Sequence, residues 1–220
     1  MTRPDVPSGP LGRKESLVEQ AVRRRTGGRF ATAESEVRRI LDAGLALMRE
    51  APGGSPKIAD IVRAAGVSND AFYRAFRGKD DLVAAIVDDG TRRVLDYVAH
   101  QRDKSTDPAE QLRLCVHAVL RQAEDLDAAA TSRAVLANAS KHAGTRAVGL
   151  VRLADSLAAL LTPPLVALPS QDPERDALAL AWTLAGAVEH FVFSERIPTA
   201  DDVDHLCRWA LHAVSAPSVS

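Results

Sequence analysis

The 220-residue sequence is poor in the residues that support metal, redox or disulfide chemistry. It has two cysteines, Cys115 and Cys207, which belong to no Cys-x-x-Cys pair and fall on apolar stripes, as reduced core thiols do. Its six histidines are scattered, and Asp202-x-x-His205 comes nearest to a di-iron motif. Such a site needs two Glu-x-x-His pairs and further carboxylates. We therefore expect no metal site and no cofactor.

Catalytic and targeting signatures are also missing. The sequence has no Gly-x-Gly-x-x-Gly after a strand, no Gly-x-Ser-x-Gly, no P-loop and no His-Glu-x-x-His, so we assign no catalytic residue and keep an all-helical enzyme only as an alternative. No signal peptide is visible, and the apolar run 177–188 is too short to cross a bilayer. We expect a cytoplasmic protein that is neither an enzyme nor bound to a membrane.

Net charge is nearly absent, but the charges are unevenly distributed. The formal net charge is -1, whereas residues 12–79 carry 14 Lys and Arg against 8 Asp and Glu, and residues 80–220 carry 13 against 20. Neutralising phosphates supplies most of the sequence-independent affinity for nucleic acids. The basic N-terminal part is therefore the part suited to contact DNA.

Residues 58–76 have the pattern of a helix, a tight turn and a second helix. Apolar residues at helical spacing give the first helix one buried face, and Gly66 can adopt the left-handed conformation that ends it. Ser68 is a good N-cap, because its hydroxyl can accept a hydrogen bond from the backbone N–H of Asp70 or Ala71. The second helix is predicted over residues 69–76.

The two faces of this second helix differ in character. Phe72 and Phe76 are four residues apart and share a face that we expect to be core. The opposite face is polar and suited to read base edges, as the second helix of a DNA-binding helix-turn-helix does. The candidate DNA-reading residues on that face are Asn69, Asp70, Tyr73 and Arg74.

The stretch 57–82 resembles the TetR family of bacterial transcriptional regulators, whose pattern is roughly T-x-x-D/E-I-A-x-x-A-G-V-S-x-G-x-L-Y-x-H/Y-F-x-x-K-x-x-L. The matching residues are Asp60, Ile61, Ala65, Gly66, Val67, Ser68, Tyr73, Phe76, Lys79 and Leu82. The departures are Lys57, Val62, Asp70, Phe72 and Ala75. Ala75 removes a phosphate contact that Arg74 or Lys57 could replace. Asp70 either stabilises the helix dipole, which is the simpler interpretation, or accepts from a cytosine N4.

The residue patterns and the resemblance together predict an all-α protein with three segments, of which the arm is inferred from its composition alone. These are a flexible basic N-terminal arm (residues 1–29), a helix-turn-helix DNA-binding domain (30–79), and a helical effector-binding and dimerisation domain (80–220). The resemblance also implies a ligand-responsive regulator, a repressor in preference to an activator, that binds a palindromic double-stranded DNA operator as a homodimer and is released by a small-molecule effector. A constitutive regulator, or one controlled by a protein partner, is the alternative.

The arm carries four arginines beside Gly27 and Gly28, which we expect to separate it from a first domain helix over residues 32–50. It is either a DNA-binding arm, which tracks phosphates or enters the minor groove, or a solvated tail. Its position beside the helix-turn-helix favours a DNA-binding arm. The full set of expected DNA contacts is Arg23, Arg24, Arg25, Arg29, Lys57, Ser68, Asn69, Asp70, Tyr73, Arg74 and Lys79.

The remaining chain is predicted to be helical, with helices near residues 80–101, 112–123, 131–143, 147–161 and 200–214, a further helix after Pro173, and a proline-rich loop over 162–172. The run 177–188 is apolar on every side, so we expect burial on more than one face. The resemblance implies a dimer interface made by the last two helices. The apolar stripe of the last helix is Val203, Leu206, Cys207, Ala210, Leu211 and Val214.

Polar and aromatic residues within these otherwise apolar helices are candidates for the effector pocket, which in proteins is mostly apolar with a few orienting polar groups. Each could equally be a core or interface side chain. The candidates are Tyr97, His117, Arg121, Asn138, Arg152, Trp182, Glu189, His190 and Phe193.

Overall fold

The computed structural model describes residues 17–51, 54, 56–140 and 145–215, and for residues 17–31, 145, 146 and 215 it describes the backbone alone. Within these ranges there are helices and no strands, so the predicted all-α class is confirmed. The helices are α1 (Leu17–Glu50), α2 (Ile58–Ala65), α3 (Asn69–Ala75), α4 (Lys79–Arg102), α5 (Pro108–Glu124), α6 (Leu126–Ala139), α7 (Thr145–Ala167), α8 (Pro173–Ser194) and α9 (Ala200–Ser215).

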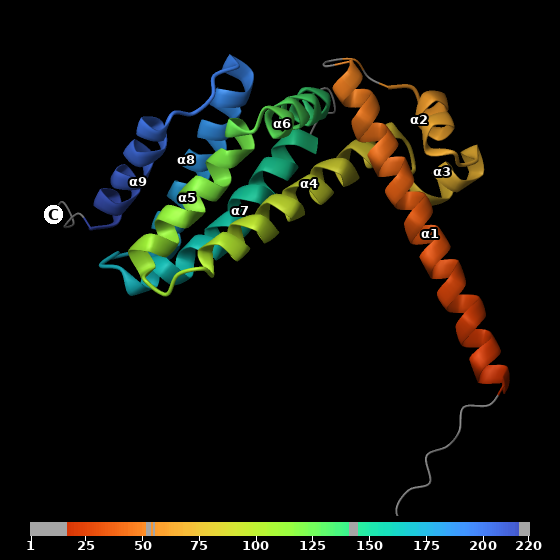
Figure 1. Cartoon of the computed structure of the whole chain (residues 1–220), viewed down its shortest axis with the longest axis horizontal. Helices are drawn as coiled ribbons and strands as arrows, with labels where there is room; N and C mark the ends of the chain where they lie inside the picture. Colours follow the sequence, from red (N-terminus) through yellow and green to blue (C-terminus); the bar gives the residue numbers. More distant parts are fainter. Residues whose placement is uncertain (1–16, 52–53, 55, 141–144, 216–220) are drawn as a thin grey trace, which may run out of the picture.

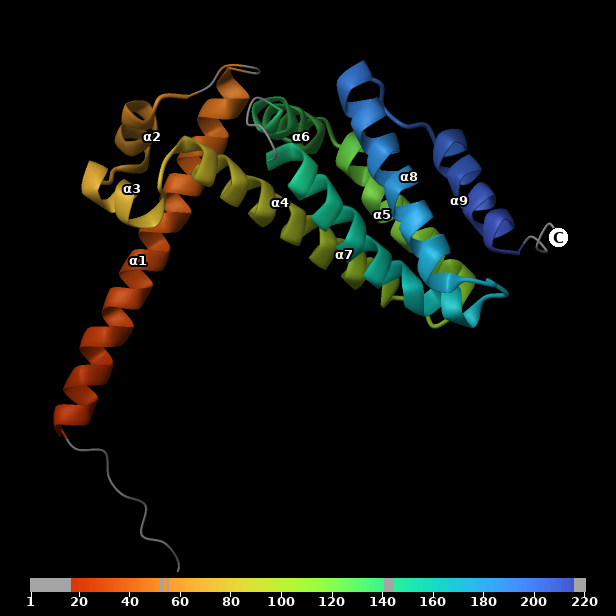
Figure 2. The ribbon, with the colours of Figure 1, turned by 180° about the vertical axis from the view of Figure 1, so that it is seen from behind.

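The helices are arranged as a small head and a larger body joined by α4 (Figures 1 and 2). In the head, α2 and α3 pack against the C-terminal half of α1. In the body, α5 and α7 pack along α4, α8 packs on α5 and α7, and α9 packs on α5. The N-terminal half of α1 projects beyond the head in both views.

The core of the head is completed by helices that belong to the body. Phe72 and Ile61 are fully buried together with Leu82 at the start of α4. Ala134 and Ala139 of α6 belong to the same cluster, so the head is docked on both α4 and α6. An added side chain in this region would disturb a packed interior, because protein cores have few voids.

Helices α1 and α4 pack closely at Gly44. A Cβ atom at this position would lie 3.1 Å from the Ile86 Cδ1 atom and 3.3 Å from the Leu82 Cδ2 atom. A side chain at this crossing would therefore require Ile86 and Leu82 to shift by a few tenths of an ångström.

The expected break at Gly27 and Gly28 is wrong. Helix α1 runs without interruption from Leu17 to Glu50 through both glycines. A glycine costs about 1 kcal/mol relative to alanine inside a helix, but it retains its N–H and can adopt helical dihedrals, so it weakens a helix without ending it. Residues 1–16 of the expected arm lie outside the described part of the chain.

The expected loop over residues 162–172 is also too long, because α7 continues through Pro163 and Pro164 to Ala167. Pro164 cannot donate to the Leu160 carbonyl four residues earlier. Arg102 of α4 supplies the missing donor, with its Nη1 atom 3.2 Å from the Leu160 oxygen. A side chain from another helix thus satisfies the carbonyl that the proline leaves open.

Helix α6 begins at Leu126, five residues before the start that the sequence pattern indicated. The Asp125 carboxylate caps it, accepting from the backbone N–H of Asp127 at 2.9 Å and of Ala128 at 3.0 Å. These backbone hydrogen bonds lower the pKa of Asp125, because they stabilise its charged form. The cap satisfies N–H groups that the first turn of a helix otherwise leaves open.

Helix α8 is buried on one face of the single chain, not on several as expected. Ala181 and Leu184 are fully buried, whereas Leu178, Trp182 and Phe193 are 39%, 40% and 46% exposed. Large apolar side chains gathered on one exposed face commonly mark an interaction surface.

The stripe on α9 faces the body of its own chain. Val203, Cys207, Ala210 and Val214 are buried within the same core cluster as α5 and α8. These four side chains therefore fill the chain's own core, whereas Leu206 and Leu211 of the same stripe are only partly buried. The exposed side of α9 carries Trp209, which is 42% exposed.

Helices α7 and α8 each contain an apolar segment longer than the run 177–188, which lies within α8. Segments Ala147–Ala167 and Pro173–Ser194 are long and apolar enough to cross a membrane by length and composition, with 28% and 39% of their most apolar windows buried. Core helices pass the same test, and these two pack against each other within the body. The composition is therefore weak evidence for a membrane.

Candidate functional site

The turn between α2 and α3 has the geometry that the sequence predicted. Gly66 adopts φ 62° and ψ 39°, the left-handed conformation that ends α2. The Ser68 hydroxyl caps α3 by accepting from the backbone N–H of Ala71 at 3.1 Å. The connection between the two helices is therefore fixed by local hydrogen bonds.

Arg39 anchors this turn to α1, a role that the sequence did not reveal. Its Nη1 atom donates to the carbonyl oxygens of Ala65 at 3.1 Å and Gly66 at 3.2 Å. These two carbonyls lie at the end of α2, where a positive charge is favourable. Because α1 carries several arginines, only the three-dimensional arrangement shows which of them reaches the turn.

The outward face of α3 carries the candidate DNA-reading residues. Asn69, Asp70, Tyr73 and Arg74 are all exposed, whereas Phe72 is fully buried and Phe76 is 6% exposed. The Tyr73 ring packs edge-on against Phe72, with 5.3 Å between the ring centroids. The predicted division of α3 into a core face and a polar outer face is confirmed.

Charged residues flank this face. The Arg74 Nη2 atom lies 4.0 Å from the Glu36 Oε2 atom of α1, although the Arg74 side chain is 71% exposed. Lys57 is exposed just before α2, and Lys79 is half-buried at the first position of α4. The side chains of Arg23, Arg24, Arg25 and Arg29 are outside the described part of the chain, and only their backbone is placed, on α1.

A cavity of about 630 Å³ lies where the head meets the body. Leu41 and Leu45 of α1 form part of its wall, and the rest comes from α4, α5, α6, α7 and α8. Most of the lining side chains are apolar, as is typical of small-molecule sites. The charged lining residues are Asp42, Asp89, Arg93, Arg121, Asp125, Asp127 and Glu189.

The structure brings three of the nine candidate pocket residues to the cavity, namely Tyr97, Arg121 and Glu189. Trp182, His190 and Phe193 are exposed on α8, and His117 is exposed on α5. Arg152 borders a separate, smaller hollow beside α4. Asn138 is fully buried, with its amide donating to the Ala134 carbonyl at 2.9 Å. Helical periodicity identified polar residues but not the side of the bundle that each would face.

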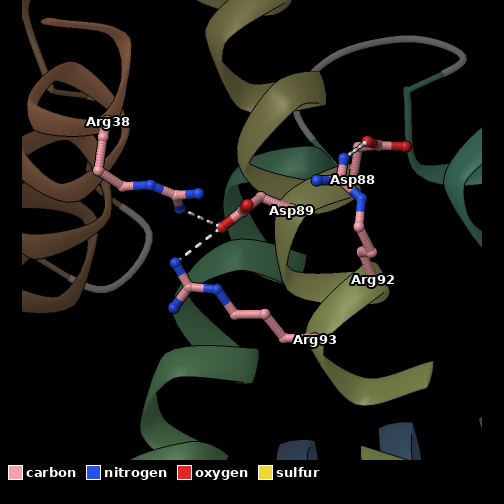
Figure 3. Close-up of polar contacts among 5 residues, drawn as sticks. All are labelled: Arg38, Asp88, Asp89, Arg92 and Arg93. Atoms are coloured by element: carbon pink, nitrogen blue, oxygen red, sulfur yellow. Dashed lines mark hydrogen bonds and ion pairs between the residues drawn. The ribbon is translucent and has the colours of Figure 1, made fainter. Parts of the chain in front are cut away.

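An ion-pair network joins the head to the cavity wall (Figure 3). The Asp89 Oδ2 atom of α4 lies 3.0 Å from the Arg38 Nη1 atom of α1 and 2.9 Å from the Arg93 Nη2 atom. The hydrogen bond from Arg38 to Asp89 and the negative charge of Asp89 raise the pKa of the Arg38 guanidinium. Asp42 and Glu34 make smaller contributions. Sequence reasoning missed Asp89, because α4 carries several acids and the sequence does not show which of them faces α1.

Both cysteines are free thiols in the body core, as predicted. Burial raises the pKa of Cys115 to about 12, because the charged thiolate is disfavoured away from water. Burial raises the pKa of Cys207 as well. Neither thiol is therefore activated as a nucleophile, which requires the thiolate form.

A family model described as "Bacterial regulatory proteins, tetR family" matches residues 40–86. This span runs from the second half of α1 through the helix-turn-helix into α4, and so covers the residues that build the core of the head. No curated protein matches the chain in sequence at a significant level.

Solved structures with the same fold cover most of the chain. The fatty acid degradation regulator FadR from Bacillus halodurans is 20% identical over 80% of this chain and 94% of its own, with a TM-score of 0.63. A TetR-like transcriptional regulator from Rhodococcus sp. RHA1 is 22% identical over 83% and 97%, with a TM-score of 0.59. RolR, solved in complex with resorcinol, is 17% identical over 84% and 89%, also with a TM-score of 0.59.

The family match covers the head, and the shared fold extends through the body. The family model, FadR and the Rhodococcus structure are described as regulatory proteins. The exposed polar face of α3, the fixed turn before it and the family match show that residues 40–86 form a helix-turn-helix similar to that of bacterial regulatory proteins of the tetR family.

Proposed function

We propose that the protein is a cytoplasmic, homodimeric repressor that binds a palindromic operator and releases it when a small molecule enters the cavity. The observation that carries this proposal is the position of the cavity. Its wall includes α1 of the head as well as five helices of the linker and body. An occupant would therefore contact the DNA-binding unit directly and could favour one orientation of the head over another.

The DNA-reading part of the proposal rests on the exposure of α3. Asn69 and Arg74 are proposed to contact base edges or nearby phosphates, and Lys57, Ser68, Tyr73 and Lys79 to position the DNA backbone. Asp70 follows the N-cap of α3, where its charge stabilises the helix dipole in the simpler interpretation. The arginines of the N-terminal segment are proposed to add phosphate contacts.

The dimer is proposed to form through the exposed apolar face of α8 and the adjoining part of α9. Leu178, Trp182, Phe193 and Trp209 are each roughly two-fifths exposed or more in the single chain. A second copy would cover these side chains, and a two-fold dimer would present two heads to two half-sites. The buried side chains of the α9 stripe fill the chain's own core.

A small-molecule effector is favoured over control by a protein partner or constitutive binding. The cavity is large enough for a small organic molecule and has an apolar wall with a few polar groups. RolR, which shares the fold, was solved in complex with resorcinol. A constitutive regulator would have no need for a cavity that contacts the head.

Sequencing the DNA fragments that the purified protein retains would test the operator proposal. We expect inverted repeats, and we expect Asn69→Ala and Arg74→Ala each to weaken binding by about 1 to 3 kcal/mol if they read bases. Arg92→Ala is the matched control for removal of a charge, because Arg92 is 63% exposed in an ion pair on α4, away from α3. Unchanged affinity in both α3 variants would remove the recognition-helix assignment.

The N-terminal segment can be tested separately by deleting residues 1–28. For every phosphate that the segment neutralises, the deletion should lower the slope of log affinity against log salt concentration by roughly one and weaken binding to all sequences alike. An unchanged slope would show that the segment does not bind DNA.

Sedimentation tests the dimer. Trp182→Asp would bury an unpaired charge in the proposed interface and should shift the protein toward monomer with a fall in operator affinity. Leu126→Asp is the matched control, because Leu126 is 71% exposed on α6, outside the α8 and α9 face. A wild-type monomer that binds its operator tightly would contradict both the interface and the two-half-site mechanism.

A further inference from the structure

Asp89 lies between the cavity and the DNA-binding head. It is part of the cavity wall on α4, and its Oδ2 atom pairs with Arg38 of α1 as well as with Arg93 of its own helix (Figure 3). Its side chain is only 16% exposed, whereas those of Arg38 and Arg93 are 47% and 61% exposed. A single half-buried carboxylate oxygen thus ties the head to the rim of the cavity.

The charged residues of the cavity wall are predominantly acidic. Five acids and two arginines belong to the wall itself, and from outside it Arg38 pairs with Asp89 and Arg49 pairs with Asp127. The five acids are Asp42, Asp89, Asp125, Asp127 and Glu189. Both arginines of the wall interact with its acids. Arg93 pairs with Asp89, and the charge of Arg121 contributes to lowering the pKa of Asp125. The remaining wall is mostly leucine, valine and isoleucine. An occupant that fits this wall combines an apolar body with a positive charge.

We propose that the cavity takes an apolar organic cation and that Asp89 couples its binding to the head. A positive group beside Asp89 competes with Arg38 for the carboxylate and weakens the tie between α1 and α4. The ligand thereby has different affinities for the tied and untied arrangements, which is the requirement for a ligand to shift their populations. This inference rests on the proposed effector function and names the chemical class of the effector and the residue that transmits its binding.

The neighbouring ion pair provides a matched control. Asp88 and Arg92 lie on the same helix with 2.8 Å between their Oδ2 and Nη2 atoms, and their side chains are 56% and 63% exposed. They border the smaller hollow, which shares Thr91 and Leu95 with the main cavity, and they do not line the main cavity itself. Asp88→Asn therefore removes the same charge from the adjacent position without affecting the tie to α1.

Three molecules with the same ten-carbon chain test the charge preference. Decyltrimethylammonium, decanol and decanoate, kept below the concentrations at which they aggregate, are titrated calorimetrically into the full-length wild type, Asp89→Asn and Asp88→Asn proteins. We expect the cation to bind wild type and Asp88→Asn at least about tenfold more tightly than the other two molecules. In Asp89→Asn this preference should fall to within a few fold.

A second measurement tests the coupling. The cation should change the affinity of the wild type and Asp88→Asn proteins for a DNA fragment that the wild type retains. In Arg38→Gln the cation should still bind, because Asp89 is present, but its effect on DNA affinity should disappear. This variant keeps the proposal testable should Asp89→Asn fail to fold.

The outcomes separate the two levels of the proposal. If none of the three molecules binds, both the effector function and the cation assignment are overturned. Binding without preference for the cation, or tighter binding of decanoate, overturns the cation assignment and leaves the effector function standing. If the cation binds but alters DNA affinity equally in wild type and Arg38→Gln, the coupling through Asp89 is overturned.

Discussion

The short helices of the head and the long helices of the body end for different physical reasons. In the head, α2 ends at Gly66, which has φ 62°, and α3 starts at the Ser68 cap, so each boundary residue acts through its own backbone or a neighbour three residues away. In the body, α7 passes through two prolines, and the carbonyl left open at Leu160 is satisfied by Arg102, 58 residues away. A helix can therefore continue through prolines where a side chain that is distant in sequence supplies the missing hydrogen bond.

The surfaces of the two regions differ in a corresponding way. The outer face of α3 is polar, which suits contacts with phosphates and base edges. The outer face of α8 exposes Leu178, Trp182 and Phe193. The head is therefore complete as a single chain, whereas the body presents an apolar surface suited to a second protein surface.

The largest expected effect comes from truncating one fully buried side chain in the head or in the body. Phe72→Ala removes a fully buried ring from the head, and Leu184→Ala removes a fully buried side chain from the body. Each should cost about 3 to 5 kcal/mol of folding stability. Phe72→Ala should increase the rate of amide hydrogen exchange in α1, α2 and α3. Leu184→Ala should increase it in α5 and α8.

Helix α6 provides a sharper test of the same comparison. Because Ala134 and Ala139 belong to the head core, α6 should follow the head in Phe72→Ala, although it lies in the C-terminal part of the chain. Equal acceleration of all helices in both variants would show instead that head and body unfold as one cooperative unit.

A smaller effect is expected at the turn of the head. Gly66→Ala places a side chain at φ 62° and should cost about 1 to 2 kcal/mol, because L-residues are disfavoured in the left-handed region. Gly78→Ala is the control, since its φ of 171° is extended and no atom lies within 4 Å of the added Cβ. Denaturant midpoints should fall for the first variant and remain near wild type for the second.

The head was therefore the more predictable region. The alternation of Phe72 and Phe76 with exposed polar residues, the glycine turn and the serine cap all operate within a few residues, and the structure confirms each of them. For α6 and α7, helix type followed from periodicity, but the boundaries depended on Asp125 and on Arg102. Arg102 and Leu160 are 58 residues apart, and nothing in the sequence indicated that they would meet.

The sites show the same contrast. The exposed residues of α3 could be named from one helix, whereas the cavity wall combines six helices and includes only three of the nine candidates. Asp89 could not be distinguished from Asp88 by sequence, because both are acids on one polar helix and only the packing of α1 selects one of them. The DNA and effector contacts themselves stay predictions.

A third effect concerns the pH dependence of the body. Burial raises the pKa of Cys115 from its ordinary value of 9.0 to about 12, so the unfolded thiol loses its proton first. The contribution of the buried, protonated thiol to folding stability is therefore fully present below pH 9. It is lost as pH rises toward 12, by at most about 1.4 kcal/mol per pH unit. Cys115→Ala should flatten the decline in unfolding free energy between pH 9 and pH 10. Parallel curves for variant and wild type would contradict this assignment.

The smallest effect separates the structural role of Ser68 from its proposed contact with DNA. Ser68→Ala removes the cap of α3 and should cost about 1 kcal/mol, as Asp107→Ala should at the start of α5, where Asp107 accepts from the Glu110 N–H at 3.0 Å. Glycine at an N-cap costs only a few tenths of a kcal/mol, so Ser68→Gly should recover most of the stability. If the hydroxyl also positions the DNA backbone, Ser68→Gly will remain weak in operator binding despite that recovery, while Asp107→Ala will bind normally. Recovery of both stability and affinity in Ser68→Gly would limit Ser68 to its cap.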